Sequence, residues 1–218
     1  WLSIGAGLVM AADSEVRNGI YLPDASDQSV SMVNAEVSVR MRLVPHFGLA
    51  VEPIPPLRLT ATLHLPLRPE TSGDSSMRFF NYPYEEGTDA LAQTFTNVIG
   101  FLPWRASFGA SWTWRDPGPV QGAIAGGITW EQWSQYVDRH AERPEDAWHD
   151  TVSATLAGEV AWSVHRFAAD VAFVPSPVPA QTGRSNYVDG HRLVVGAAWE
   201  ALFPVGSVSL GAGVQVQV

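Results

Sequence analysis

The chain alternates between apolar and polar residues over much of its length. The clearest stretch is 151–164, where even positions such as Val152, Leu156 and Val160 are apolar or Gly, and odd positions such as Thr151 and Glu159 are polar or small. A period of two residues predicts a strand with one apolar and one polar face. Soluble strands usually run about 3–10 residues. This stretch is longer, and its length suits a strand that crosses a bilayer at a tilt, which needs about 9–11 residues within the hydrocarbon.

The same alternation predicts nine strands, at 1–10, 29–52, 57–68, 93–115, 120–136, 151–164, 167–174, 191–200 and 207–218. Pro45 and Pro103 interrupt two of them and predict β-bulges, because proline cannot donate a hydrogen bond within a central ladder. The connections alternate between long loops (12–28, 69–92, 137–149, 175–190) and tight turns (53–56, 116–119, 165–166, 201–206). This alternation is typical of outer-membrane barrels, which have long extracellular loops and short periplasmic turns.

The aromatic residues fit the same interpretation. Trp104 and Trp114 share the apolar face of one predicted strand, and their spacing corresponds to roughly 24 Å of depth, close to the apolar band between two aromatic girdles. Trp130, Trp133 and Tyr136 are expected near the outer girdle, where amphipathic rings prefer the membrane interface. The alternative is that these rings fill the core of a soluble β-sandwich.

Composition narrows the class of protein further. Charged residues make up 16% of the chain, below the roughly 25% of soluble domains. No apolar run approaches the 18 or more residues of a transmembrane helix. The net charge of −9 disfavours a nucleic-acid partner. The absence of cysteine excludes disulfides and thiolate metal sites, and we expect no cofactor.

A resemblance to a known family rests on several short motifs. The stretch 173–182 contains Ser176, Pro177, Val178 and Pro179 in a loop after a strand, and Asp189 and Arg192 follow before the next strand. This "SPVP" loop with a downstream Asp-x-x-Arg resembles that of the FadL/TodX family of outer-membrane transporters for hydrophobic compounds. Residues 128–134 and 102–104 are similar to that family's Trp-Ser strand end and Leu-Pro strand start.

The resemblance implies a 14-stranded barrel with an N-terminal hatch, through which a hydrophobic ligand diffuses and leaves by a lateral opening. The hatch motif is missing here, and nine is an odd strand number whereas bacterial single-chain barrels have even numbers. We therefore expect residues 1–218 to be part of such a barrel, all-β, up-and-down and antiparallel. The implied protein is not an enzyme and is monomeric. It lies in the outer membrane, in contact with lipid and lipopolysaccharide.

Candidate ligand-binding residues are Arg40 and Arg105, both on the polar face of predicted strands. Either could hold the carboxylate of a fatty-acid-like ligand, although we favour pairing with nearby carboxylates such as Glu36, Glu159 or Asp170. The run 138–150 has the residue types of a metal site but is interpreted as a solvated loop tip. No catalytic motif points to an esterase or protease. A purely structural or adhesive barrel remains the alternative function.

Overall fold

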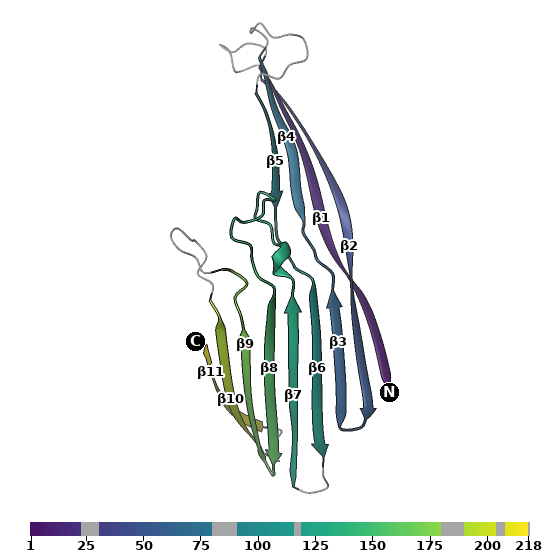
Figure 1. Cartoon of the computed structure of the whole chain (residues 1–218), viewed down its shortest axis with the longest axis vertical. Coiled ribbons are helices and arrows are strands. Elements are labelled where there is room, and N and C mark those ends of the chain that lie inside the picture. Colours follow the sequence, from purple (N-terminus) through teal and green to yellow (C-terminus); the bar gives the residue numbers. More distant parts are fainter. Residues whose placement is uncertain (23–30, 80–90, 116–118, 180–189, 204–207, 218) are drawn as a thin grey trace.

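The computed structural model describes residues 1–22, 31–79, 91–115, 119–179, 190–203 and 208–217. Within these residues one sheet contains all the strands (Figure 1). The strands are β1 (Leu2–Leu22), β2 (Met32–Ile54), β3 (Leu57–His64), β4 (Glu70–Phe79), β5 (Leu91–Val98), β6 (Arg105–Arg115), β7 (Val120–Glu131), β8 (Thr151–Trp162), β9 (His165–Val174), β10 (Arg192–Phe203) and β11 (Val208–Gln217). A short 3₁₀ turn, Trp133–Gln135, follows β7. None of the described helical residues forms a segment long and apolar enough to cross a membrane.

The sheet has a broad lower part and a narrow upper part (Figure 1). Its order is β11-β10-β9-β8-β7-β6-β3-β2-β1-β4-β5. We call "lower sheet" the part formed by β3, β6 to β11 and the paired residues 2–10 and 43–54 of β1 and β2. The "upper ribbon" is β4, β5 and the paired residues 14–22 and 32–39. The lower sheet is antiparallel throughout, whereas β4 joins β1 in parallel.

The chain changes sides between these two parts. In the lower sheet β3 pairs with β2, but in the upper ribbon β4 pairs with β1 on the other side of the β1–β2 hairpin. The connecting residues 65–69 must therefore cross the hairpin. A second segment, 99–104, connects β5 to β6 beside it, and Leu67 and Leu102 join the two segments by a pair of backbone hydrogen bonds of 2.9 and 2.8 Å. Pro66 and Pro103 lie in these segments, where the regular ladders end.

The all-β fold predicted from the sequence is confirmed, but the described residues form eleven strands rather than the nine predicted. The predicted loop 12–28 is wrong for residues 12–22, which continue β1 in unbroken register with β2. The predicted loop 69–92 is wrong for β4 and for the start of β5. Both errors have one cause. These residues are polar at successive positions, as at Asp13, Ser14 and Glu15, so the sequence shows no alternation there. The backbone hydrogen bonds of a ladder form without such alternation.

Two predicted bulges and one turn also need correction. Pro45 does not shift the β1–β2 register; it lies opposite Leu8 in a continuous ladder. Pro103 marks a break between β5 and β6 rather than a bulge inside one strand. The β8–β9 turn lies at Ser163 and Val164, two residues before the predicted His165-Arg166. Ser163 adopts a φ of 55°, and left-handed backbone of this kind is typical of two-residue hairpin turns.

Very little of the described chain is buried. The buried apolar residues are Val44, Leu67, Val98, Val137 and Ala201, and no large side chain is fully buried among the described residues. Val44 and Leu67 lie at the crossing and line one small cavity there. Because the described residues form a single sheet with no second layer facing it, the soluble β-sandwich alternative is wrong.

Candidate functional site

The lower sheet has two chemically distinct faces. One face presents large apolar side chains to the surroundings, with Ile4 78% exposed, Phe108 59% and Leu156 51%. A soluble protein rarely exposes a contiguous apolar surface of this extent. The ladder pairs Leu156 with Val171 and Val171 with Val195, so the apolar residues continue from strand to strand. This face has the character of a lipid-contacting surface.

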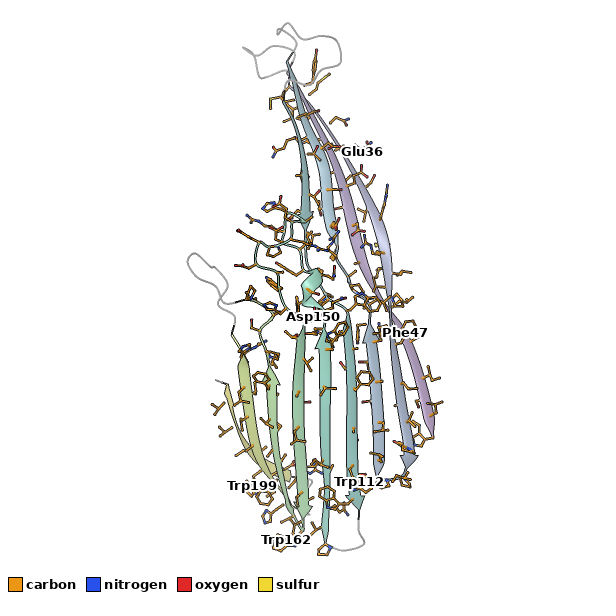
Figure 2. All side chains as sticks on the ribbon, in the orientation of Figure 1. Glu36, Phe47, Trp112, Asp150, Trp162 and Trp199 are labelled. Atoms are coloured by element: carbon orange, nitrogen blue, oxygen red, sulfur yellow. The ribbon has the colours of Figure 1, made fainter. Side chains whose placement is uncertain are left out.

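Aromatic side chains concentrate on this apolar face near the lower edge. Trp112, Trp162 and Trp199 lie at that end of the strands (Figure 2). One ladder row contains Trp114, Gly122, Val160, Phe167 and Trp199 in adjacent strands. Aromatic rings in such a row correspond to an interfacial girdle. Trp114 lies in this row, whereas Trp104 precedes the first residue of β6, so the prediction that the two rings share one strand is wrong.

The opposite, polar face consists mainly of small residues. Thr60, Gly109, Ser111, Ala125 and Ala157 line a cavity of about 250 Å³ together with Arg58. Nearer the lower turn, Arg58 and Glu52 line a second cavity of about 740 Å³, which also contacts Ser111 and Thr113. Small side chains leave open space in front of this face. The sheet therefore has an apolar surface on one side. On the other side it has a weakly polar surface with open space in front of it.

Each of the two arginines predicted as ligand contacts lies near a carboxylate, closely for Arg105 and loosely for Arg40. Arg105 places Nε 2.6 Å from Oε1 of Glu131, its direct neighbour on β7, and Trp133 donates its indole N–H to the same carboxylate at 3.2 Å. Arg40 lies within 3.9 Å of Glu15. The partners are thus Glu131 and Glu15, and not the three carboxylates considered from the sequence. A role for either arginine in ligand binding stays a prediction.

The structure fixes most of the "SPVP" loop by backbone contacts. The N–H of Ser176 donates to Nδ1 of His191 at 3.1 Å, and Val178 N–H donates to the Ser176 hydroxyl at 3.1 Å. His149 N–H, from the β7–β8 connection, donates to the carbonyl of Pro177 at 2.9 Å. Arg192 begins β10 opposite Val174, whereas Asp189 lies outside the described residues. The described part of this loop is therefore hydrogen-bonded to the β7–β8 connection and to the residue that precedes β10.

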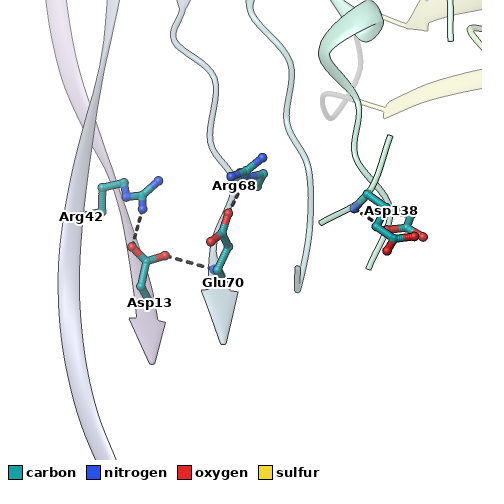
Figure 3. A network of polar contacts seen from close by, with 6 residues as sticks. Asp13, Arg42, Arg68, Glu70 and Asp138 are labelled. Atoms are coloured by element: carbon teal, nitrogen blue, oxygen red, sulfur yellow. Dashed lines mark hydrogen bonds and ion pairs between the residues drawn. The ribbon is translucent and has the colours of Figure 1, made fainter. Parts of the chain in front are cut away.

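A polar network holds β1 against β4 just above the crossing (Figure 3). Arg42 contacts the Asp13 carboxylate at 2.6 Å, and Asp13 also accepts the backbone N–H of Glu70 at 3.1 Å. Arg68 lies 2.5 Å from the Glu70 carboxylate. The partly buried Asp13 therefore fixes the first residue of the parallel strand. This network stabilises the side-to-side transition of the chain.

The acidic run 138–150 uses its first carboxylate for loop geometry. Asp138 accepts the backbone N–H groups of His140 and Glu142 at 2.8 and 2.9 Å. Asp150 likewise accepts the N–H of Ser134 at 2.9 Å. Among the described residues no group of three or more His, Asp or Glu side chains is arranged to hold a metal ion. This geometry agrees with a folded loop tip.

An aromatic cluster anchors the β7–β8 connection, and sequence patterns alone did not reveal it. Tyr136 and Trp148 stack with ring centroids 3.7 Å apart, and Phe101 meets Tyr136 edge-on at 5.5 Å. Trp133 contacts both Trp148 and Phe101. Trp133 and Tyr136 were expected in the outer girdle. They lie beyond the end of β7, and each ring contacts both Phe101 and Trp148. In the sequence, the concentration of aromatic residues in 130–148 was the only signal for this aromatic cluster.

One curled sheet with an apolar and a weakly polar face defines the class of fold: part of a β-barrel wall. No protein-family model matches the chain, and no curated protein matches it either. The fold matches a crystal structure of a FadL homologue from Pseudomonas aeruginosa with a TM-score of 0.58 and 16% sequence identity. The match covers 99% of this chain and 56% of that chain. The protein therefore has the fold of part of a FadL-like barrel, and it spans about half the length of that homologue.

Proposed function

We propose that this chain forms part of an outer-membrane barrel through which hydrophobic compounds, such as long-chain fatty acids or aromatic hydrocarbons, cross by facilitated diffusion. The observation that carries the proposal is the separation of the two faces of the lower sheet. The apolar face, with its lower aromatic row, suits contact with lipid. The polar face, with its small residues, suits the wall of an interior passage.

The likeness to a FadL homologue supports this proposal through the fold. An open sheet edge is not stable in hydrocarbon, because each unpaired backbone group there loses its hydrogen bonds to water. Among the described residues the lower sheet has two such edges, β11 and residues 2–10 of β1, and each pairs on one side only. Under the proposal, further strands complete the barrel, and the working unit is the complete protein in its membrane.

The test measures ligand binding by the complete protein in detergent. Oleate and toluene are added in parallel, and the quenching of tryptophan fluorescence reports binding. Saturable quenching by either compound supports a passage for hydrophobic compounds, and the preferred compound indicates its class. A folded, heat-modifiable barrel that shows no saturable quenching by either compound would contradict the proposal. That result would favour a structural or adhesive barrel.

A further inference from the structure

The upper ribbon has an open edge along β2. In the lower sheet β2 pairs with β1 on one side and with β3 on the other, but above the crossing it pairs among the described residues with β1 alone. Every residue from Met32 to Leu43 is exposed, and this part of β2 forms one margin of the ribbon (Figure 1). An open strand edge of this length can pair with a further strand, and natural proteins usually protect such edges.

The free backbone groups of this edge belong to the odd-numbered residues. Trp1 and Glu52 exchange both of their backbone hydrogen bonds, at 3.0 and 2.9 Å. Hydrogen-bonded and non-hydrogen-bonded pairs alternate along an antiparallel ladder, and the β1–β2 register is unbroken up to Met32. The even-numbered residues of β2 are therefore bonded to β1, and the odd-numbered residues direct their N–H and C=O groups away from it. Pro45, which lacks an N–H, accordingly lies at an odd position.

The features that usually protect an edge strand are absent from residues 32–43. This part of β2 contains no proline, its register with β1 has no bulge, and its charged residues carry both signs. Its odd-numbered large apolar side chains are more than half exposed: Val33, Val37, Val39, Met41 and Leu43. The ladder row through Trp130, near the top of the lower sheet, reaches β2 at Phe47. Residues 32–42 thus lie above the lower sheet, where the lipid of the proposed function does not cover them.

The sequence of this edge is complementary to itself. In an antiparallel pair of two copies centred on Ser38, Glu36 of each copy lies opposite Arg40 of the other. Opposite charges on directly facing residues stabilise a strand pair. The other face then contains apolar pairs only: Val33 with Leu43, Ala35 with Met41, and Val37 with Val39. Because odd-numbered residues lie opposite odd-numbered ones, the free N–H and C=O groups of the two edges also meet.

Nearby registers with the same backbone match are less favourable. A pair centred on Val37 places Glu36 opposite Ser38 and loses the charged pair. A pair centred on Glu36 or on Arg40 places two like charges directly opposite each other, which destabilises a strand pair. The charges therefore select the register centred on Ser38.

The two arginines of this edge differ in their availability. Arg42 contacts the Asp13 carboxylate at 2.6 Å. Arg40 is 81% exposed, and its nearest carboxylate oxygen, on Glu15, is 3.9 Å away. Glu36 of a second copy therefore meets in Arg40 a guanidinium without a close carboxylate among the described residues. A register shifted to bring Glu36 opposite Arg42 would compete with an existing contact.

We infer that residues 33–43 of β2 pair antiparallel with the same residues of a second copy of this chain, so that the two upper ribbons form one continuous sheet. Such a contact is isologous, with one two-fold axis at Ser38. The resemblance to the FadL/TodX family implied a monomer, whereas this edge predicts association through the part of the chain above the lower sheet. The pairing itself is independent of the proposed function.

Antiparallel pairing also determines where the two lower sheets lie. β2 runs from the upper ribbon into the lower sheet (Figure 1), and in the second copy it runs the opposite way. The two lower sheets therefore lie at opposite ends of the joined ribbons, with roughly 40 Å between Val44 of one copy and Val44 of the other, at about 3.3 Å per residue. If each lower sheet lies in a membrane, the two copies belong to facing membranes. This step rests on the proposed function and makes the contact adhesive.

A single introduced cysteine tests the pairing, because residues 1–218 contain none. In the inferred register Ser38 lies opposite Ser38 of the second copy in a non-hydrogen-bonded pair, with Cα atoms about 4.5 Å apart, which suits a disulfide. Asn34→Cys is the matched control. Asn34 is exposed on the same face, but its two copies would lie roughly 26 Å apart at about 3.3 Å per residue. Both variants of the complete protein are oxidised in detergent and analysed on a non-reducing gel.

We expect the disulfide-linked dimer to form at least tenfold faster in Ser38→Cys than in Asn34→Cys. Equal rates in the two folded variants would overturn the pairing, and this result is expected if another segment of the complete protein covers the edge. Quenching by oleate and toluene is measured on the same samples. A protein that binds either compound but forms no dimer keeps the proposed function and loses this inference.

Charge reversal tests the register and the facing membranes together. Glu36→Arg and Arg40→Glu each bring like charges together in a pair of identical copies, whereas one copy of each variant restores both opposite-charge pairs. The variants are placed in separate phosphatidylcholine vesicles, and vesicle clustering is followed by light scattering. Glu142→Arg and Arg143→Glu are the matched controls, because they change the charge by the same amounts at exposed residues away from β2.

We expect vesicles with the wild-type protein or with either control to cluster. Each reversed variant alone should cluster at least tenfold more slowly, and mixing the two vesicle populations should restore the rate. A mixture that stays dispersed while wild-type vesicles cluster would overturn the register. Wild-type vesicles that stay dispersed, although Ser38→Cys forms the dimer in detergent, would overturn the arrangement between facing membranes.

Discussion

Arg105 and Glu131 face each other across β6 and β7, with Arg105 Nε 2.6 Å from Glu131 Oε1. The Glu131 side chain is only 18% exposed, whereas that of Arg105 is 48% exposed. Glu131 also accepts the indole N–H of Trp133, at the start of the β7–β8 connection. The ion pair therefore joins the end of β7 to the ladder row that continues from Arg105 through His64 to His46.

Breaking this pair should lower the free energy of unfolding modestly. We expect Arg105→Ala to cost about 1 kcal/mol, since partly exposed ion pairs are weakened by solvent and salt. The loss should exceed that of Arg40→Ala, whose nearest carboxylate oxygen, on Glu15, is 3.9 Å away. A double-mutant cycle with Glu131→Gln, measured by urea titration in lipid vesicles, isolates the coupling. A coupling of zero at low salt would contradict the geometry.

Gly122 should tolerate no side chain, because Trp114 lies over it. A Cβ at Gly122 would be 2.4 Å from Trp114 Cζ2 and 2.6 Å from the Glu159 carbonyl oxygen. We expect Gly122→Val to destabilise the barrel by about 1–3 kcal/mol through overpacking and to shift the tryptophan emission. Gly5→Val is the control, since nothing lies within 4 Å of a Cβ there. Equal unfolding midpoints for the two variants would argue against this packing.

The sequence predicted the lower sheet well because its period-two pattern has a direct physical cause. Leu156 and Thr155 lie on opposite faces of the sheet. The alternation of apolar and polar residues along each of these strands therefore shows which residues share a face. The upper ribbon has no such contrast. Residues 12–22 and β4 were missed because Asp13, Glu15 and Asp74 lie on strands whose polar residues carry no period-two pattern.

The site was only partly predictable for a related reason. Arg105 was identified from its polar position, but its partner Glu131 is 26 residues away in sequence and becomes a neighbour only through the β6–β7 register. His46 and His64, whose rings stack with centroids 5.2 Å apart, were not singled out at all. Their meeting depends on the strand register and on the space above Gly7, where a Cβ would come within 2.3 Å of His46 Nε2. Neither property is visible in a single strand's pattern.

The stacked pair Tyr136 and Trp148 should hold the β7–β8 connection against the sheet. Trp148→Ala removes the 3.7 Å stacking contact and the contact with Trp133. We expect a loss of about 1–3 kcal/mol and faster cleavage by trypsin after Arg139, which is followed by His140. Trp162→Ala, at a 57% exposed residue on the apolar face, is the control and should leave that cleavage rate unchanged. Limited proteolysis followed by mass spectrometry measures both.

Two adjacent residues on β8 test the assignment of the faces most directly. Leu156 is on the apolar face and 51% exposed, and Thr155 is its neighbour on the polar face. If the apolar face contacts lipid, Leu156→Arg should cost about 2–4 kcal/mol, as charges do on the lipid face near the bilayer midplane. Thr155→Arg should change the free energy of unfolding by less than about 0.5 kcal/mol, as for ordinary surface substitutions. Guanidinium titrations of both variants in phosphatidylcholine vesicles give the comparison. A larger cost for Thr155→Arg would exchange the two faces and remove the basis for an interior passage lined by the small residues.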